Sequence, residues 1–332
     1  MRIMKKTLFI LSLALATIAQ AGIYRHDKSP KAYKELAAQQ QFDCVGMVMD
    51  DVGQKQMGSC VLIGSRYVLS AGHVFVDNDI RVDTYYLDKN GKTVPKPVEG
   101  GAKMLVNQPV AHRPAIITNY SFRFGNHRYY GKKLRLYQPY LDSLTAGNLF
   151  CGDIVLIELS EPVKGITPAT LNTAFNEQGS IITGVGFGAS GPANDPENIG
   201  PYMEKIAGNN VIDKIEGYEV NGKSSLLSSD MDAPGRTDCN AMGSAKPLPL
   251  EWGPGGGDSG GGLFRQVAGK WQLVGIITGG PASGLNMTSF MQKKGYYGGT
   301  IQNQRVSAYN EWIKETIHLF EVESMRVSED KK

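Results

Sequence analysis

The sequence predicts an all-β protein that ends in one amphipathic helix. The chain has 40 glycines and 16 prolines among 332 residues, which argues against a mainly helical structure. Short apolar segments rich in β-branched residues recur along it, and no helix-length periodicity separates them. An antiparallel barrel or sandwich is therefore favoured over a parallel α/β sheet.

The first 21 residues are typical of a secretory signal peptide. Basic side chains at the start are followed by an apolar run from Leu8 to Ile18 and by the small-residue ending Ala19-Gln20-Ala21. The apolar run is too short for a bilayer core, which needs about 20 residues. We expect cleavage before Gly22, a secreted or periplasmic product, and no membrane association after signal removal.

The net charge of +3 belongs entirely to this leader, which carries three basic side chains and no acid. The remaining chain is formally neutral. A neutral chain argues against a nucleic-acid partner, although residues 84–140 are rich in Tyr, Lys and Arg. A solvated insertion is the favoured interpretation of that stretch.

The elements expected after the leader follow in chain order. Residues 22–41 form a polar N-terminal segment with one short helix at 31–40. Strands are expected at 44–49, 60–70, 154–159, 180–185 and 271–278. From Ser307 onward, apolar residues recur at i, i+3 and i+4, which predicts a C-terminal helix over 307–326.

All four cysteines lie after the leader, where an oxidising compartment permits disulfides. Their wide spacing argues against zinc, and three pairings are open. The midpoint of Cys44 and Cys60 falls in the turn signal Asp50-Asp51-Val52-Gly53, so these two are expected to face each other across a hairpin. Cys151 and Cys239 are then expected to form the second bridge.

A glycine motif at 186–191 fits the dinucleotide pattern G-x-G-x-x-G and follows an expected strand. The next residues are Pro192-Ala193-Asn194-Asp195-Pro196, which cannot open a helix toward a pyrophosphate. No cofactor is therefore expected. No metal site is assigned either, because the cysteine spacing argues against zinc and no ligand spacing in the 84–140 insertion is diagnostic of calcium.

Three separated segments carry the residues of nucleophilic catalysis. His73 follows an apolar strand, Asp153 precedes a buried strand, and Ser259 lies in the run Gly255-Gly256-Gly257-Asp258-Ser259-Gly260-Gly261. A serine hydroxyl needs an imidazole to accept its proton, and the imidazole needs an acid that fixes its tautomer. Glycines beside the serine allow backbone N–H groups to approach a substrate oxyanion.

These segments resemble the motifs of trypsin-like (chymotrypsin-fold) serine proteases, and the short leader is that of a secreted bacterial-type member. Ser70-Ala71-Gly72-His73, Gly152-Asp153-Ile154-Val155-Leu156 and Gly257-Asp258-Ser259-Gly260-Gly261 are similar to the three family segments, in the same chain order. The resemblance covers about residues 42–320. It implies two antiparallel six-stranded β-barrels, at 42–165 with the insertion and at 166–306.

The resemblance also implies a role for each motif residue. Ser259 would be the nucleophile, His73 the general base and then acid, and Asp153 the orienting acid. The N–H groups of Gly257 and Ser259 would form the oxyanion hole. The strand Thr278-Gly279-Gly280 would bind the substrate backbone, with Thr278 near Asp153.

Activation and specificity are less clearly marked in the sequence. Asp258 matches the family acid that receives the N-terminal ammonium, which would arise at Gly22 or Ile23, with Arg25 as an alternative cation. The specificity position by ungapped counting is Gly253, which favours an apolar pocket. Glu251 is the alternative if the register shifts, and would favour basic residues.

The sequence thus predicts a monomeric secreted serine endopeptidase that acts on protein or peptide substrates and has a protein inhibitor as a further partner. The alternative is a catalytically silent protein that keeps the fold and binds a partner through the 84–140 insertion. The complete His73, Asp153 and Ser259 set argues against this alternative, because a binding role does not need all three.

Overall fold

The computed structural model describes residues 22–90, 92–145, 151–196, 198, 200, 203–279 and 296–329. The predicted signal peptide and Gly280 lie outside these residues. The chain divides into two compact units: one contains 19–75 and 114–332, and the other contains 1–18 and 76–113. Both barrel-forming regions belong to the larger unit.

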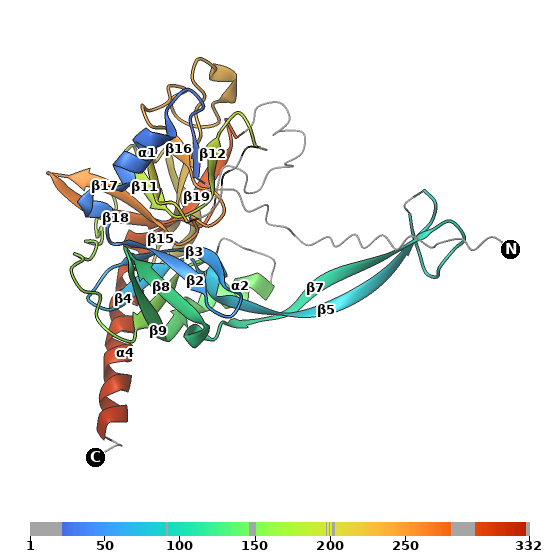
Figure 1. The fold of residues 1–332 in the computed structure, drawn as a ribbon, viewed down its shortest axis with the longest axis horizontal. Helices are drawn as coiled ribbons and strands as arrows, with labels where there is room; N and C mark the ends of the chain where they lie inside the picture. The colour runs from blue at the N-terminus through green and yellow to red at the C-terminus, as the bar shows by residue number, and fades with distance from the viewer. Residues whose placement is uncertain are drawn as a thin grey trace. The chain divides into compact units, whose positions relative to one another are not determined.

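A closed six-stranded antiparallel barrel forms the first half of the larger unit (Figure 1). Around the barrel the strands follow in the order β10-β4-β3-β2-β8-β9. Their bounds are β2 Val45–Asp50, β3 Lys55–Leu62, β4 Tyr67–Ser70, β8 Tyr120–Phe124, β9 His127–Leu136 and β10 Val155–Leu159. The predicted strand 60–70 is two strands, because the chain turns where the Ile63 N–H donates to the Tyr67 carbonyl at 2.8 Å.

The predicted insertion at 84–140 is too long, because residues 120–136 are barrel strands β8 and β9. Phe122 and Phe124 are at most 1% exposed and contribute to the barrel core. The residues that alternate with such core positions include Arg123 and Lys133, which are less buried. This alternation of aromatic and basic residues is what makes the stretch look like a solvated segment in the sequence.

A curled seven-stranded antiparallel sheet forms the second half of the larger unit, in the order β13-β11-β17-β18-β19-β15-β14. Its strands are β11 Ile181–Gly186, β13 Ile206–Val211, β14 Lys214–Val220, β15 Lys223–Asp230, β17 Gly262–Val267, β18 Lys270–Ile276 and β19 Thr300–Arg305. The sheet thus has seven strands where six were predicted, and β14 and β15 at one edge form a hairpin. Asn221 and Gly222 close this hairpin with φ angles of +50° and +70°, which suits a two-residue turn.

A small sheet joins the N-terminal segment to the second half. It contains β1 Gly22–Tyr24, which pairs in parallel with β12 Ser190–Pro192 and antiparallel with β16 Trp252–Gly253. Ile23 is fully buried in this sheet.

The helices are α1 Pro30–Ala37, α2 Gln138–Thr145 and α4 Asn310–Glu329, with short 3₁₀ helices at Gln40–Phe42, Gly72–Phe75, Ile117–Asn119, Thr237–Cys239 and Val306–Tyr309. Helix α1 starts after Ser29, whose hydroxyl accepts from the Lys31 N–H, and has proline at its first position. The predicted C-terminal helix is confirmed as α4. In the part of the chain that is described, no helix is long and apolar enough to cross a membrane.

The smaller unit contains a long β-ribbon. Strands β5 Val76–Leu87 and β7 Ala102–Pro114 form a three-stranded sheet with the short β6 Thr93–Val94, in the order β6-β5-β7. Ion pairs such as Arg113 with Asp77, at 3.4 Å, link its two long strands.

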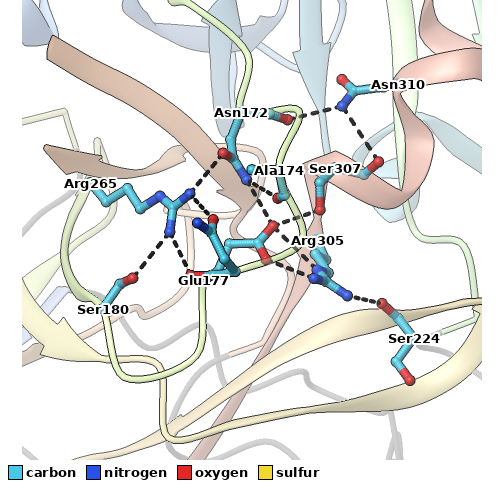
Figure 2. A network of polar contacts seen from close by, with 10 residues as sticks. Asn172, Ala174, Glu177, Ser180, Ser224, Arg265, Arg305, Ser307 and Asn310 are labelled. Atoms are coloured by element: carbon cyan, nitrogen blue, oxygen red, sulfur yellow. Dashed lines mark hydrogen bonds and ion pairs between the residues drawn. The ribbon is translucent and has the colours of Figure 1, made fainter. Parts of the chain in front are cut away.

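A buried polar network fastens the connection between barrel and sheet to the second half (Figure 2). Glu177, fully buried, accepts from the Arg305 guanidinium at 2.7 Å and from the Ser307 hydroxyl at 2.6 Å. Arg265 of β17 donates to Asn172 at 2.9 Å. The charge of Glu177 is thus paired with Arg305 of β19, and the neutral Asn172 is hydrogen-bonded to Arg265 of β17.

The predicted bridge between Cys44 and Cys60 is not formed, and both residues are buried thiols. The hairpin itself is confirmed, but its register differs from the predicted one. Cys60 faces Gly46, while Cys44 accepts a hydrogen bond from the Leu62 N–H at 2.8 Å. A one-residue bulge and a turn centred after Val52 shift the pairing, so the cysteines are diagonal neighbours rather than opposite ones.

The predicted bridge between Cys151 and Cys239 is also not formed, because Cys151 is a thiol. Cys151 lies beside Ser143, whose hydroxyl donates to the Cys151 carbonyl. Cys239 instead packs in the core cluster that contains Met231 and Tyr297.

Candidate active site

His73 and Asp153 are brought together by the pairing of two barrel strands. His73 lies in the 3₁₀ helix that follows β4, and Asp153 lies two residues before β10. Strands β4 and β10 pair antiparallel, with Ser70 opposite Val155. The residues that extend from these ends therefore meet.

The contact between the two residues is bidentate. The His73 imidazole Nδ1 lies 2.7 Å from Asp153 Oδ2, and the His73 backbone N–H donates to Oδ1 at 2.7 Å. Asp153 is 2% exposed and the His73 side chain 40% exposed, so the imidazole reaches solvent while the carboxylate does not.

Asp153 determines the protonation behaviour of His73. Partial burial lowers the pKa of the imidazole, but the charge of Asp153 and its hydrogen bond outweigh this effect, so the pKa is raised above its ordinary value. With the Nδ1 proton directed at Asp153, the lone pair of the neutral ring is on Nε2.

Tyr140 is a site residue that the sequence analysis missed. Its hydroxyl hydrogen-bonds to Asp153, and burial together with the nearby carboxylate raises the pKa of the phenol. Gly72 permits the approach, because a Cβ there would lie 2.9 Å from the Tyr140 ring and 3.1 Å from Asp153 Oδ1. The Gln138-Pro139 pair at the start of α2 was a helix signal inside the stretch assigned as insertion.

Ser259 belongs to a loop of the second half that docks on the barrel. Its carbonyl accepts from the Ser59 N–H at 2.7 Å. The following residue, Gly260, is so close that a Cβ would lie 2.1 Å from both the Ser59 carbonyl and the Ser70 hydroxyl. Ser70 ends β4, three residues before His73, so the docking brings the Ser259 loop beside the chain that leads into His73.

The backbone around Gly257 has the conformation that a glycine permits, with φ at +87°. Its carbonyl accepts from the Ser59 hydroxyl at 2.9 Å. Among the described residues, none accepts a hydrogen bond from the N–H of Gly257 or of Ser259. The N–H groups of Gly257 and Ser259, on either side of Asp258, are the two donors that the predicted oxyanion hole would use.

Asp258 is fully buried and is held by backbone donors. Its carboxylate accepts from the Gly188 N–H at 2.8 Å and from the Gly255 N–H at 3.0 Å. Burial raises its pKa to about 6, against the opposing effect of these hydrogen bonds. Gly186 lies so close that a Cβ there would contact the carboxylate.

Arg25, the alternative cation for Asp258, has other partners. Its guanidinium donates to both oxygens of Asp27, at 2.9 and 2.6 Å, and to the Leu248 carbonyl at 2.7 Å. These contacts occupy both edges of the guanidinium, so Arg25 does not serve as the partner of Asp258.

Glu251 is nearly fully buried, at 2% exposure. Its carboxylate accepts from the N–H groups of Leu248 and Asp232, and burial, with a contribution from the charge of Asp232, raises its pKa to about 8. Gly253 lies in β16, where it pairs with Ile23.

The expected substrate strand lies just after β18. Thr278 is 9% exposed, its N–H donates to Asn303 Oδ1 at 3.1 Å, and its hydroxyl donates to the Gln302 carbonyl at 3.3 Å. The hydroxyl of Thr278 thus has a partner other than Asp153, and their expected proximity stays a prediction. Gly279 is buried beside it.

Comparison with known proteins gives one curated relative and a set of similar structures. No family model matches the chain. Chymotrypsin-C of Rattus norvegicus is 28% identical over 177 residues, which cover 50% of this chain and 55% of the relative. The chain thus spans about half the length of that relative. Among solved structures, neuropsin, a serine protease expressed in the limbic system of mouse brain, matches with 16% identity and a TM-score of 0.47, over 84% of this chain and 97% of that chain.

Proposed function

We propose that this chain, which has the chymotrypsin-like fold of trypsin-like serine proteases, is a secreted serine endopeptidase with Ser259 as its nucleophile. The observation that carries the proposal is the pairing of His73 with buried Asp153 beside the docked Ser259 loop. An exposed histidine paired through Nδ1 with a buried carboxylate is the arrangement that general-base catalysis requires.

In the proposed reaction, the Ser259 hydroxyl oxygen attacks the carbonyl carbon of the scissile peptide bond while His73 Nε2 accepts its proton. The carboxylate of Asp153 stabilises the imidazolium that forms. The N–H groups of Gly257 and Ser259 donate to the oxyanion, an interaction worth about 3–4 kcal/mol per donor in other enzymes.

The imidazolium then returns the proton to the leaving amine, and the C–N bond breaks to give an acyl-enzyme. Water attacks the ester with His73 again as base, which releases the acid product and restores Ser259. The raised pKa of His73 favours the imidazolium that these steps require.

Covalent labelling with a fluorophosphonate tests this assignment, because the probe reacts only with an activated serine. The wild type should be labelled, and Ser259→Ala should lose labelling while its unfolding curve stays unchanged. Ser65→Ala removes an exposed serine outside the site and serves as the matched control. Absence of labelling in the folded wild type, beside a labelled control protease, would instead favour the catalytically silent alternative.

For specificity, we infer a preference for apolar residues before the cleaved bond. Gly253 supplies no acidic side chain, and the buried carboxylate of Glu251 accepts from the N–H groups of Leu248 and Asp232 rather than facing solvent. A panel of peptides that differ only in this residue measures the preference. Faster cleavage after Arg or Lys would contradict it.

We also infer that an α-ammonium created at Gly22 or Ile23 pairs with Asp258. Parallel pairing of Gly22 with Ser190 directs the start of β1 toward Gly188, whose N–H already holds the carboxylate. N-terminal sequencing of active enzyme checks the start, and a start far downstream would overturn the inference.

The pH dependence of stability gives a second check on this ammonium. The raised pKa of Asp258, about 6, makes the folded state bind its proton more tightly than the unfolded state does. This contribution, about 3 kcal/mol, is full below about pH 4 and is lost as pH rises through 6. An ammonium partner lowers the pKa, so a chain that begins at Gly22 should lose less stability over this range than one that begins at Gln20. Equal losses would contradict the pairing.

We further propose that residues 1–21 direct export and that the product is released as a soluble monomer. Its partners would be protein or peptide substrates and a protein inhibitor. The small-residue ending before Gly22 supports the export step. Mass spectrometry of protein recovered outside the cytoplasm should find Gly22 or Ile23 as the first residue.

A further inference from the structure

A cavity of about 850 Å³ lies at the junction of the barrel and the second half, away from the candidate active site. It is lined by α1, β2, the β8–β9 turn and segments of the second half, and none of His73, Asp153 and Ser259 lines it. Its volume falls in the upper part of the range for small-molecule sites, which is about 300–1,000 Å³.

Cationic side chains dominate the charged lining of this cavity. They are Lys34, Arg123, Lys164 and Lys205, with one acid, Asp43. Lys34 is paired with Glu204 at 2.6 Å, but neither Arg123 nor Lys164 has an ion pair with any residue in the described ranges. The cavity therefore carries excess positive charge.

Arg123 is placed where the protein alone disfavours it. It lies directly opposite Arg128 in the β8–β9 pair, and like charges in facing positions are destabilising. Arg128 is compensated by Asp51 at 3.5 Å. An anion beside Arg123 would supply the missing compensation.

Lys205 is a second charge with too little compensation. Its side chain is only 19% exposed, and its ammonium donates to the Phe42 carbonyl at 2.6 Å and lies 3.8 Å from Asp43. Burial lowers the pKa of this ammonium, and Asp43 opposes the effect only in part. A bound anion would favour the charged form.

The rest of the lining includes apolar side chains beside the polar Asn126 and His127. Val45 and Met47 of β2 contribute, together with Phe124 and Phe187. A ligand that matches these walls needs an apolar body as well as an anionic group. We propose that the cavity binds a small organic carboxylate with an apolar body.

Phe187 connects this cavity to the loop that carries Ser259. Its N–H donates to the Ser59 hydroxyl at 3.0 Å, and that hydroxyl donates to the Gly257 carbonyl at 2.9 Å. Gln56 Nε2 donates to the Phe187 carbonyl at 2.5 Å. Ligand binding against Phe187 therefore acts on the peptide next to the oxyanion donors, a consequence that rests on the proposed function.

Calorimetric titration of the Ser259→Ala variant tests binding without any need for catalysis, so its outcome is independent of the proposed function. The probes are decanoate below its micellar concentration, decanol, which lacks the charge, and acetate, which lacks the apolar body. A second pair of probes uses a peptide as the apolar body. It compares N-acetyl-Leu-Phe that has a free C-terminal carboxylate with the same dipeptide as its uncharged C-terminal amide. We expect saturable binding of decanoate or of the free-acid dipeptide. Decanol, acetate and the dipeptide amide, each of which lacks the charge or the apolar body, should bind much more weakly.

Three variants locate the site. Arg123→Gln should weaken binding about tenfold, a loss of about 1.4 kcal/mol. Ala38→Trp, at an exposed lining position, should fill the apolar space and reduce binding at least as much. Lys270→Gln, an exposed position that does not line the cavity, should leave binding unchanged. Three outcomes would overturn the proposal. Acetate or decanol could bind as tightly as decanoate, or neither decanoate nor the free-acid dipeptide could bind. The third outcome is an unchanged affinity in both Arg123→Gln and Ala38→Trp.

Discussion

Replacing Gly260 with alanine should push the Ser259 loop away from the barrel segment that leads into His73, because Gly260 packs tightly against that segment. The new Cβ would lie 2.1 Å from the Ser59 carbonyl, 2.1 Å from the Ser70 hydroxyl and 3.0 Å from the Ala71 nitrogen. Two of these atoms are backbone, so a rotamer change at Ser70 cannot relieve the overlap.

Three effects add to the cost of this substitution. A left-handed φ of +87° costs an alanine about 1 kcal/mol. Overpacking costs about 1–3 kcal/mol. If the Ser70 hydroxyl yields, its hydrogen bond to the Ser59 carbonyl, at 2.7 Å, is lost, for about 1 kcal/mol more. We expect the free energy of unfolding to fall by about 3–5 kcal/mol, and the folded fraction to label poorly with a fluorophosphonate.

Gly269→Ala is the matched control. Gly269 has a φ of +77°, but no heavy atom lies within 4 Å of its Cβ position, so only the backbone cost of about 1 kcal/mol applies. Urea unfolding measures both variants on the same scale. A loss in Gly260→Ala within about 0.5 kcal/mol of the loss in Gly269→Ala, with unchanged labelling, would refute the docking argument.

Two substitutions and one pH profile test the site and its support. Tyr140→Phe removes a hydrogen bond to a carboxylate and should lower the free energy of unfolding by about 2 kcal/mol in urea; a loss below about 0.5 kcal/mol would mean that the bond to Asp153 contributes little. Glu177→Gln leaves the buried Arg305 charge unpaired and should cost about 3–5 kcal/mol by the same measurement, and a near-neutral effect would contradict the role of the network. The value of kcat/KM should fall as pH decreases through the pKa of His73, which is raised above its ordinary value of 6.5. A fall in kcat/KM that begins only well below pH 6.5 would be inconsistent with the His73 pairing.

The exposed pair Lys31 and Glu35 provides the control for Glu177→Gln. Their side chains are 81% and 66% exposed and 3.5 Å apart, so Glu35→Gln should change stability by no more than about 0.5 kcal/mol. A similar loss in both variants would show that burial does not set the cost.

The motifs predicted the contact between His73 and Asp153 better than composition predicted the strands around it, because a short motif specifies residue types more tightly than barrel packing does. His73 and Asp153 were identified from short segments, and the structure joins them at 2.7 Å. The sequence does not predict barrel strands β8 and β9, because their outward residues are basic. The Lys and Arg content of the stretch indicates a solvated segment, although Phe122 and Phe124 show the period of two that a strand requires.

Other errors came from local geometry that composition does not encode. A one-residue bulge and a turn displaced by half a residue together move the position opposite Cys44 from Cys60 to Leu62, since register in a hairpin depends on each residue of the turn and ladder. Tyr140 is separated from Asp153 by the chain that follows α2, and no spacing rule connects the two. Only the tertiary packing of Tyr140 on Gly72 reveals its contact with the carboxylate.

Ser59 links the position of the Ser259 loop to the orientation of the peptide bond that follows Gly257. Its N–H holds the Ser259 carbonyl, while its hydroxyl holds the Gly257 carbonyl. The preceding Gly58 makes this possible, because a Cβ there would lie 2.7 Å from the Ser259 carbonyl. Since Phe187 also donates to the Ser59 hydroxyl, a rotation of that hydroxyl would affect the carbonyl of Gly257 and the cavity wall together. The Gly-Ser pair of β3 is therefore as much a part of the candidate active site as the glycine-rich loop itself.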